Sequence, residues 1–122
     1  MAIKNALRER ATKTFSSAAL QTLYSRRVEH DKIHCIQQVA WEIDKTTSGG
    51  NTRVRLFIAG HGYNHYLEEQ DGPTASQLYT YSEPVWLVPG ERLAIEIDQG
   101  QADTTTEMHL TGYWTTFKEG IV

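Results

Sequence analysis

Apolar side chains occupy every second position over much of the last third of the chain. After a Pro-Gly turn at residues 89–90, Leu93, Ile95 and Ile97 alternate with polar or small residues. A second alternating segment follows at residues 107–114. A period of two residues is typical of a β-strand with one buried and one solvent-exposed face. The pattern therefore predicts two β-strands in this region.

The same pattern predicts a long strand over His34–Asp44 and a return strand over Arg53–Ala59. Gln37 interrupts the apolar positions of the first strand, which indicates a bulge or a buried side chain with a hydrogen-bond partner. The polar, glycine-containing turn at residues 46–51 makes an antiparallel hairpin of the two strands the expected pairing. The inward-facing side chains are expected to be Ile33, Cys35, Val39, Trp41 and Ile43 on the first strand and Val54, Leu56 and Ile58 on the second.

Shorter segments complete the predicted fold. Residues 60–66 continue or close the return strand, residues 68–74 read as an acidic loop, and residues 76–81 and 83–88 as short strands. About seven or eight strands with frequent turns predict an all-β protein, an antiparallel β-sandwich of the jelly-roll kind, with a barrel left open. No helical segments alternate with the strands, which argues against a parallel α/β sheet.

The first 22 residues differ from the rest of the chain. Ile3, Leu7, Ala11, Phe15 and Ala18 have helical spacing, so this segment is expected to form a short helix or an extended arm ahead of a sandwich domain at residues 23–122. Residues 1–27 contain six basic residues and one acidic residue, whereas residues 28–122 contain six basic and fourteen acidic residues. A basic arm could therefore lie on the acidic body of another copy.

The size and composition of the chain indicate which class of protein it belongs to. With 122 residues and 39% hydrophobic residues, it is expected to form one globular domain. No segment approaches the roughly 18 apolar residues of a membrane span, and the N-terminus lacks the apolar stretch of a signal peptide. The lone Cys35 is expected to be a buried free thiol. These features predict a protein made in the cytoplasm, without membrane association.

Three segments carry a resemblance to a known class. They are residues 51–58 with the sequence NTRVRLFI, residues 87–93 with the sequence LVPGERL, and the aromatic pair at residues 113–114. In this order, residues 23–117 resemble small β-sandwich virion proteins of tailed bacteriophages. The resemblance implies a structural subunit of the virus particle, such as a head decoration (cement) protein or a fibre or tail accessory subunit. Its partners would be the major capsid protein or another virion protein.

The sequence contains little evidence for a catalytic site. His61 and His65 suggest a metal site of the cupin kind, but on a strand they would lie about 13 Å apart. Glu96 and Asp98 share one strand face at about 7 Å, a separation compatible with glycoside hydrolysis, but they fit equally the solvent-exposed face of that strand. No nucleophile elbow or phosphate-binding loop is present. The sequence therefore predicts a non-enzymatic protein with no cofactor and no metal.

Aromatic and basic residues are the better candidates for an interface. Trp41, Trp86 and Trp114 are expected in the core. The acidic body disfavours nucleic-acid binding. The expected partner is another copy of the chain, with a trimer favoured, and the alternative is a carbohydrate-binding or receptor-binding module. The predicted interface residues are Arg8, Arg10, Lys13, Arg26, Arg27, Tyr63, Tyr66, Tyr79 and Tyr81.

Overall fold

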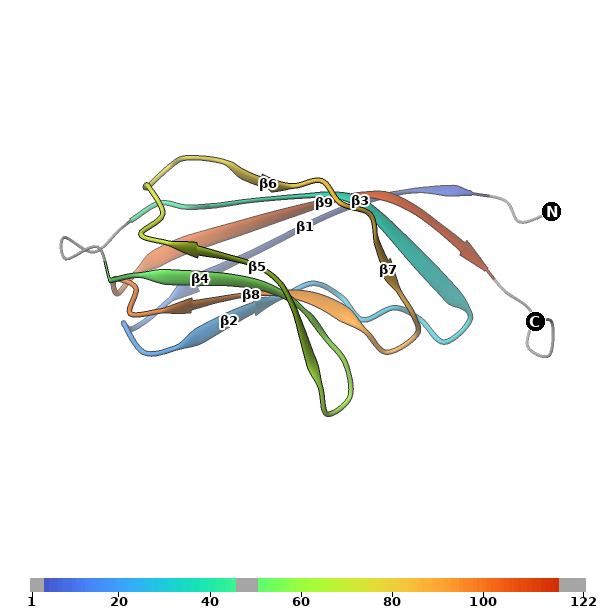
Figure 1. Ribbon diagram of the computed structural model, residues 1–122, viewed down its shortest axis with the longest axis horizontal. Helices are drawn as coiled ribbons and strands as arrows, with labels where there is room; N and C mark the ends of the chain where they lie inside the picture. Colours follow the sequence, from blue (N-terminus) through green and yellow to red (C-terminus); the bar gives the residue numbers. More distant parts are fainter. Residues whose placement is uncertain (1–3, 46–50, 117–122) are drawn as a thin grey trace.

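Nine β-strands make up the regular structure of the part of the chain that is described (Figure 1). The computed structural model describes residues 4–45 and 51–116, and these ranges contain no helix. The predicted all-β class is confirmed. The strands are β1 (Asn5–Phe15), β2 (Gln21–Tyr24), β3 (Lys32–Ile43), β4 (Arg53–Ala59), β5 (Asn64–Asp71), β6 (Tyr79–Tyr81), β7 (Val85–Leu87), β8 (Arg92–Asp98) and β9 (Thr104–Thr116).

The strands form two antiparallel sheets packed face to face, as predicted for a β-sandwich (Figure 1). Sheet A has the order β1-β9-β3-β6, and β7 pairs with another part of β3. Sheet B has the order β2-β8-β4-β5. In the described residues, therefore, the edges are β1 and the β6 and β7 pair in sheet A, and β2 and β5 in sheet B.

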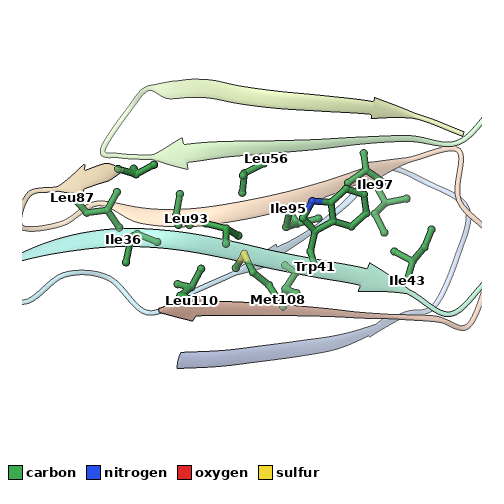
Figure 2. Close-up of a cluster of buried hydrophobic side chains, with 14 of the residues drawn as sticks. Ile36, Trp41, Ile43, Leu56, Leu87, Leu93, Ile95, Ile97, Met108 and Leu110 are labelled. Carbon is green, nitrogen blue, oxygen red and sulfur yellow. The ribbon is translucent and has the colours of Figure 1, made fainter. Parts of the chain in front are cut away.

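The hydrophobic core lies between the two sheets (Figure 2). Leu93, Ile95 and Ile97 of β8 face it, as the alternation predicts. Trp41 of β3 is buried in it and stacks on Tyr79, with ring centroids 4.6 Å apart. Each sheet thus supplies one apolar face to the core, and the alternate residues lie on two outer faces, where only some of them are exposed.

The predicted irregularity at Gln37 is a β-bulge in β3. The register against β9 shifts between Ile36 and Gln38, because one extra residue is inserted in β3. The shift reverses the alternation, so Ile36 faces the core and Cys35 lies on the outer face. The expectation of a buried free thiol at Cys35 is confirmed, but its expected place in the inward set is wrong. Its neighbours across the strands are Trp86 and Tyr113.

The predicted hairpin between the third and fourth strands is wrong. β3 pairs with β9, β6 and β7, whereas β4 pairs with β5 and β8 in the other sheet. The connection between them therefore crosses from one sheet to the other, and most of its predicted turn at residues 46–51 lies outside the described residues. Alternation identifies a strand but carries no information about its partner.

The N-terminal segment, expected to form a short helix or an extended arm, contains a strand of sheet A. Residues 5–15 form β1, which pairs with β9 along its whole length. Leu7, Ala11 and Phe15 are four residues apart, a spacing that places them on one face of a strand as well as on one face of a helix. The predicted domain boundary after residue 22 falls within β2, so β1 is part of the sandwich.

Side chains of β1 also close this side of the sandwich. The Lys13 ammonium donates a hydrogen bond to the Thr22 carbonyl at 3.2 Å. The Arg26 backbone N–H donates to Glu9 Oε2 at 2.7 Å. These bonds join the edge of sheet A to the β2 side of sheet B.

The acidic segment predicted as a loop at residues 68–74 belongs largely to a strand, β5. Its acidic side chains at residues 69 and 71 pair with arginines of the neighbouring β4, which explains how so polar a segment forms a strand. Gly60 N–H bonds to the Tyr63 carbonyl at 3.0 Å, so residues 60–63 form the turn that closes β4, one of the two predicted alternatives. No helix in the described residues has the length and apolar character needed to cross a membrane.

Candidate functional site

The outer face of sheet B carries a row of aromatic and small side chains, here called the tyrosine row: Tyr24, Ala94, Phe57 and Tyr66. Register places Tyr24 opposite Ala94, Ala94 opposite Phe57, and Phe57 opposite Tyr66. Phe57 and Ala94 are buried in a small cluster separate from the main core. Tyr24 and Tyr66 remain 41% and 51% exposed. The row is therefore an apolar floor with an exposed phenol at each end.

A network of charged side chains lies beside the tyrosine row. Arg55 Nε donates to Glu69 Oε1 at 2.7 Å, and Arg55 Nη1 lies 3.6 Å from Glu96 Oε1. Arg53 Nε donates to Asp71 Oδ1 at 3.0 Å. The hydrogen bond to Glu69 raises the pKa of Arg55, so its guanidinium stays charged. The Arg55 guanidinium also lies over the Tyr66 ring, 5.4 Å from its centroid.

Glu96 departs from its predicted solvent-exposed position. It is only 9% exposed, because Thr22 and Arg55 flank it on the neighbouring strands. Arg55 therefore holds the Glu96 carboxylate in the network. Glu96 and Asp98 do not form an isolated pair of acids of the kind considered for glycoside hydrolysis.

Two hollows on this face share Arg55. The larger, about 480 Å³ and open to solvent, is lined by Arg55, Tyr66, Leu67, Glu68 and Glu69. It lies where the register of β5 against β4 shifts between Leu56 and Phe57. The smaller, about 70 Å³, is lined by Leu20, Arg53, Arg55, Glu96 and Asp98. A guanidinium and carboxylates beside an exposed aromatic ring can hydrogen-bond a polyhydroxylated ligand and stack on it.

The β6 and β7 edge of sheet A exposes large apolar side chains, here called the Trp86 row: Trp86 and Val88 beside β7, and Leu78 at the other end of the edge, next to β6. Trp86 is 57% exposed, and its ring meets Tyr113 edge-on at 6.1 Å. The prediction that Trp86 is a core residue is wrong, because its strand neighbours Val85 and Leu87 take the inward positions. Trp41 is in the core as predicted, and Trp114 packs partly against it.

The predicted interface residues do not form one site. Arg8 and Arg10 lie on the outer face of sheet A, opposite Thr111 and His109 of β9. Arg10 pairs with Glu107, and this hydrogen bond holds the pKa of Glu107 below its usual value. Lys13 is used in the link to β2 described above. Among these basic residues of β1, only Arg8 has no ion pair or side-chain hydrogen bond in the described part of the chain.

The predicted tyrosines divide into two groups. Tyr79 and Tyr81 share a face, as expected, but that face packs against the core. The Tyr79 hydroxyl also accepts a hydrogen bond from the Thr74 backbone N–H at 2.8 Å. Tyr63 and Tyr66 are about half exposed. Of the four predicted tyrosines, only these two have exposed side chains.

Tyr63 has a structural contact as well as an exposed ring. Its hydroxyl donates to Glu91 Oε2, while Glu91 Oε1 accepts the Val88 backbone N–H at 2.9 Å. The bond to the carboxylate raises the pKa of Tyr63. Tyr63 thus joins the turn that follows β4 to the turn that precedes β8.

The two histidines considered for a metal site lie on different elements of the fold. His65 is on β5 opposite Ile58, whereas His61 is in the preceding turn beside Gly90. In the residues described, no three histidine, cysteine or carboxylate side chains are grouped so as to hold a metal ion.

Several residues of these surfaces were not predicted from the sequence as interface residues: Tyr24, Arg55, Phe57 and Trp86. A signal was present for two of them. Phe57 follows Leu56 within one alternating strand, so it must face outward, and an apolar outward residue indicates a covered outer face. Trp86 is likewise flanked by the inward pair Val85 and Leu87.

The sequence matches no protein-family model and no curated protein. The fold resembles solved structures. A chain from the acidic stable capsid structure of Helicobacter pylori bacteriophage KHP30 is 10% identical, with a TM-score of 0.66, and the match covers 93% of both chains. A chain from the structure of infectious bursal disease virus Gx strain is 13% identical, with a TM-score of 0.51 over 98% of this chain and 32% of that one.

The same fold also occurs outside viruses. A chain of dimeric latent PorU from Porphyromonas gingivalis is 10% identical, with a TM-score of 0.52 over 92% of this chain and 13% of that one. At such identities the likeness shows a shared β-sandwich and leaves function to be argued from the surfaces.

Proposed function

We propose that the protein is a non-enzymatic structural subunit of a virus particle, a phage head decoration (cement) protein that associates with its own copies and binds the capsid surface. The observation that carries the proposal is the fold likeness to a phage capsid chain over 93% of both chains. The match therefore extends over nearly all of both chains. The sequence resemblance to phage virion proteins supports the same assignment.

The Trp86 row supplies a surface for such binding. Trp86 is the main feature of this surface, because tryptophan is enriched among the residues that dominate binding energy at protein interfaces. Lys4 lies beside the row, with its ammonium 4.6 Å from the Tyr113 ring centroid. We therefore assign the capsid contact to this edge of sheet A.

The test uses particles produced by the genome that encodes this chain. Mass spectrometry of purified heads should find the chain, and heads stripped of it should bind it again. Trp86→Ser should weaken rebinding at least about tenfold, the effect of losing a hot-spot residue. Leu20→Ser is the matched control, since it removes an equally exposed apolar side chain elsewhere. Absence of the chain from purified particles would refute the proposal.

The self-association is tested separately by the mass of the purified protein in solution. Light scattering after size exclusion should give a closed oligomer, with a trimer expected at a three-fold capsid position. A monomer at all accessible concentrations would confine association to the particle surface and refute the solution oligomer.

A carbohydrate-binding module is the second candidate, favoured by the tyrosine row and the hollow beside Arg55. Tyr66 offers a ring for stacking, while Arg55 and Glu69 offer a donor and an acceptor for sugar hydroxyls. A glycan array should then give hits that Tyr66→Ala abolishes and Tyr63→Ala retains. An array without hits would leave only the structural role.

A further inference from the structure

Three arginines occupy neighbouring backbone positions where β8 begins: Arg26, Arg27 and Arg92, here called the arginine cluster. The Ser25 N–H bonds to the Leu93 carbonyl at 2.9 Å, and the Val28 N–H bonds to the Glu91 carbonyl at 2.9 Å. These two bonds lay residues 26 and 27 alongside Arg92. Like charges placed on adjacent strands repel each other, so the arrangement costs stability.

None of the three guanidinium groups forms an ion pair with a carboxylate in the described part of the chain. Arg10, Arg53 and Arg55, in contrast, each pair with an acidic side chain. Arg27 donates to the Gly90 carbonyl at 2.6 Å, and the bond from residue 26 to Glu9 uses the backbone N–H. Acidic residues outnumber basic residues in this chain, 15 to 12, so three neighbouring arginines without a carboxylate partner in the described residues are unexpected.

Arg92 is held by stacking instead of by hydrogen bonds. Its guanidinium carbon lies 3.7 Å from the centroid of the Tyr24 ring. Its Nε is buried and has no hydrogen-bond partner within residues 4–45 and 51–116. Burial and the nearby Arg27 both lower the pKa of Arg92. The terminal nitrogens of a guanidinium stacked on an aromatic ring can still donate hydrogen bonds to a carboxylate.

We propose that the arginine cluster is a docking site for a carboxylate-rich segment of another protein. A carboxylate accepts two parallel hydrogen bonds from an arginine, and it would offset the repulsion between Arg27 and Arg92. The cluster cannot pair with itself across a two-fold axis, because that would bring six cations together. The proposal is independent of the virion assignment.

The shape of the surface favours a protein segment over a small ligand. Small ligands and sugars bind in concave sites. The hollows on sheet B described above are lined by other residues. Exposed tyrosine with arginine on an open surface is instead the composition of protein-interface hot spots.

The test is a titration of the ¹⁵N-labelled protein with an N-acetylated, amidated tetraglutamate, with tetraglutamine as the uncharged control. The Arg92 Nε–Hε signal and the Tyr24 backbone signal should shift and saturate with tetraglutamate only. Arg92→Gln should weaken binding at least about fivefold, because it removes a charged hydrogen-bond donor. Arg8→Gln, which removes the same charge from sheet A, should change the affinity less than about twofold.

Each other outcome overturns the proposal. Equal losses from Arg92→Gln and Arg8→Gln would mean unspecific attraction to positive charge. Shifts produced equally by acetate would mean an adventitious ion only, and no shift at Arg92 would mean no site. A concentration-dependent oligomer that Arg92→Gln abolishes would identify the occupant as a second copy instead of a different protein. The ¹⁵N spectrum of each free variant reports whether it has kept the fold.

Discussion

Replacing Gly112 by alanine would place a methyl group inside the backbone of the neighbouring strand. A Cβ built on Gly112 lies 2.0 Å from the Cys35 carbonyl oxygen and 3.0 Å from the Gln37 nitrogen. The cause is the bulge in β3, which brings its backbone toward the point where Gly112 of β9 faces Ile36. No side-chain rotation relieves this contact, because the atoms that it meets belong to the main chain.

The geometry gives the size of the effect. Ordinary contacts of a Cβ begin near 3.4 Å, so β3 and β9 must separate by about 1.4 Å at the bulge. Overpacking of a rigid site costs up to about 3 kcal/mol, and a displacement between two hydrogen-bonded strands belongs at or above that end. For a domain of this size, about 3 kcal/mol lowers the melting temperature by roughly 12 °C.

Urea and thermal unfolding followed by circular dichroism measure this loss. Gly62→Ala is the control, because Gly62 has a φ of +81° and no atom within 4 Å of its built Cβ. That variant should lose only about 1 kcal/mol, the cost of a left-handed backbone for alanine. If the two variants melt at the same temperature, the proposed clash at the bulge does not exist.

Three further outcomes are expected. Burial lowers the pKa of His34, so the unfolded chain binds its proton more tightly than the folded one. The stability from His34 is therefore present above the unfolded pKa of about 6.5 and falls as the pH drops below it. His34→Gln should reduce the change in the urea unfolding midpoint between pH 7 and pH 5. Met108→Ala leaves a cavity at a fully buried site and should cost about 2–5 kcal/mol in urea unfolding; a loss below about 1 kcal/mol would contradict the core packing. Arg10→Ala removes an exposed pair with Glu107 and should cost less than about 1 kcal/mol, and a larger loss would show that the pair is shielded from water.

Alternation predicted the strands better than it predicted their pairing. The β8 and β4 faces follow directly from Leu93, Ile95 and Ile97 and from the apolar positions of residues 53–59, because burial of one face imposes a period of two. The position of the bulge at Gln37 also followed from a break in that period. The pairing of β1 with β9 joins segments about a hundred residues apart, and nothing local encodes it.

The candidate surfaces were harder to predict, because they depend on which outward positions become neighbours. Tyr24, Phe57 and Tyr66 come from three strands, and only the register of sheet B places them in one row. Arg26 and Arg27 were predicted as interface residues from charge alone. Their convergence with Arg92 depends on the path of the chain after β2, which the polar sequence there does not specify.

The position of β9 has a consequence for synthesis on the ribosome. It lies between β1 and β3 in sheet A, yet it is the last of the described strands to be made. Until residues 104–116 emerge, β1 and β3 have no strand between them, and the apolar face of β3 stays open to solvent. The nascent chain therefore exposes an apolar surface until β9 emerges, and folding is expected to complete only after that point, in a slow step dominated by long-range pairing.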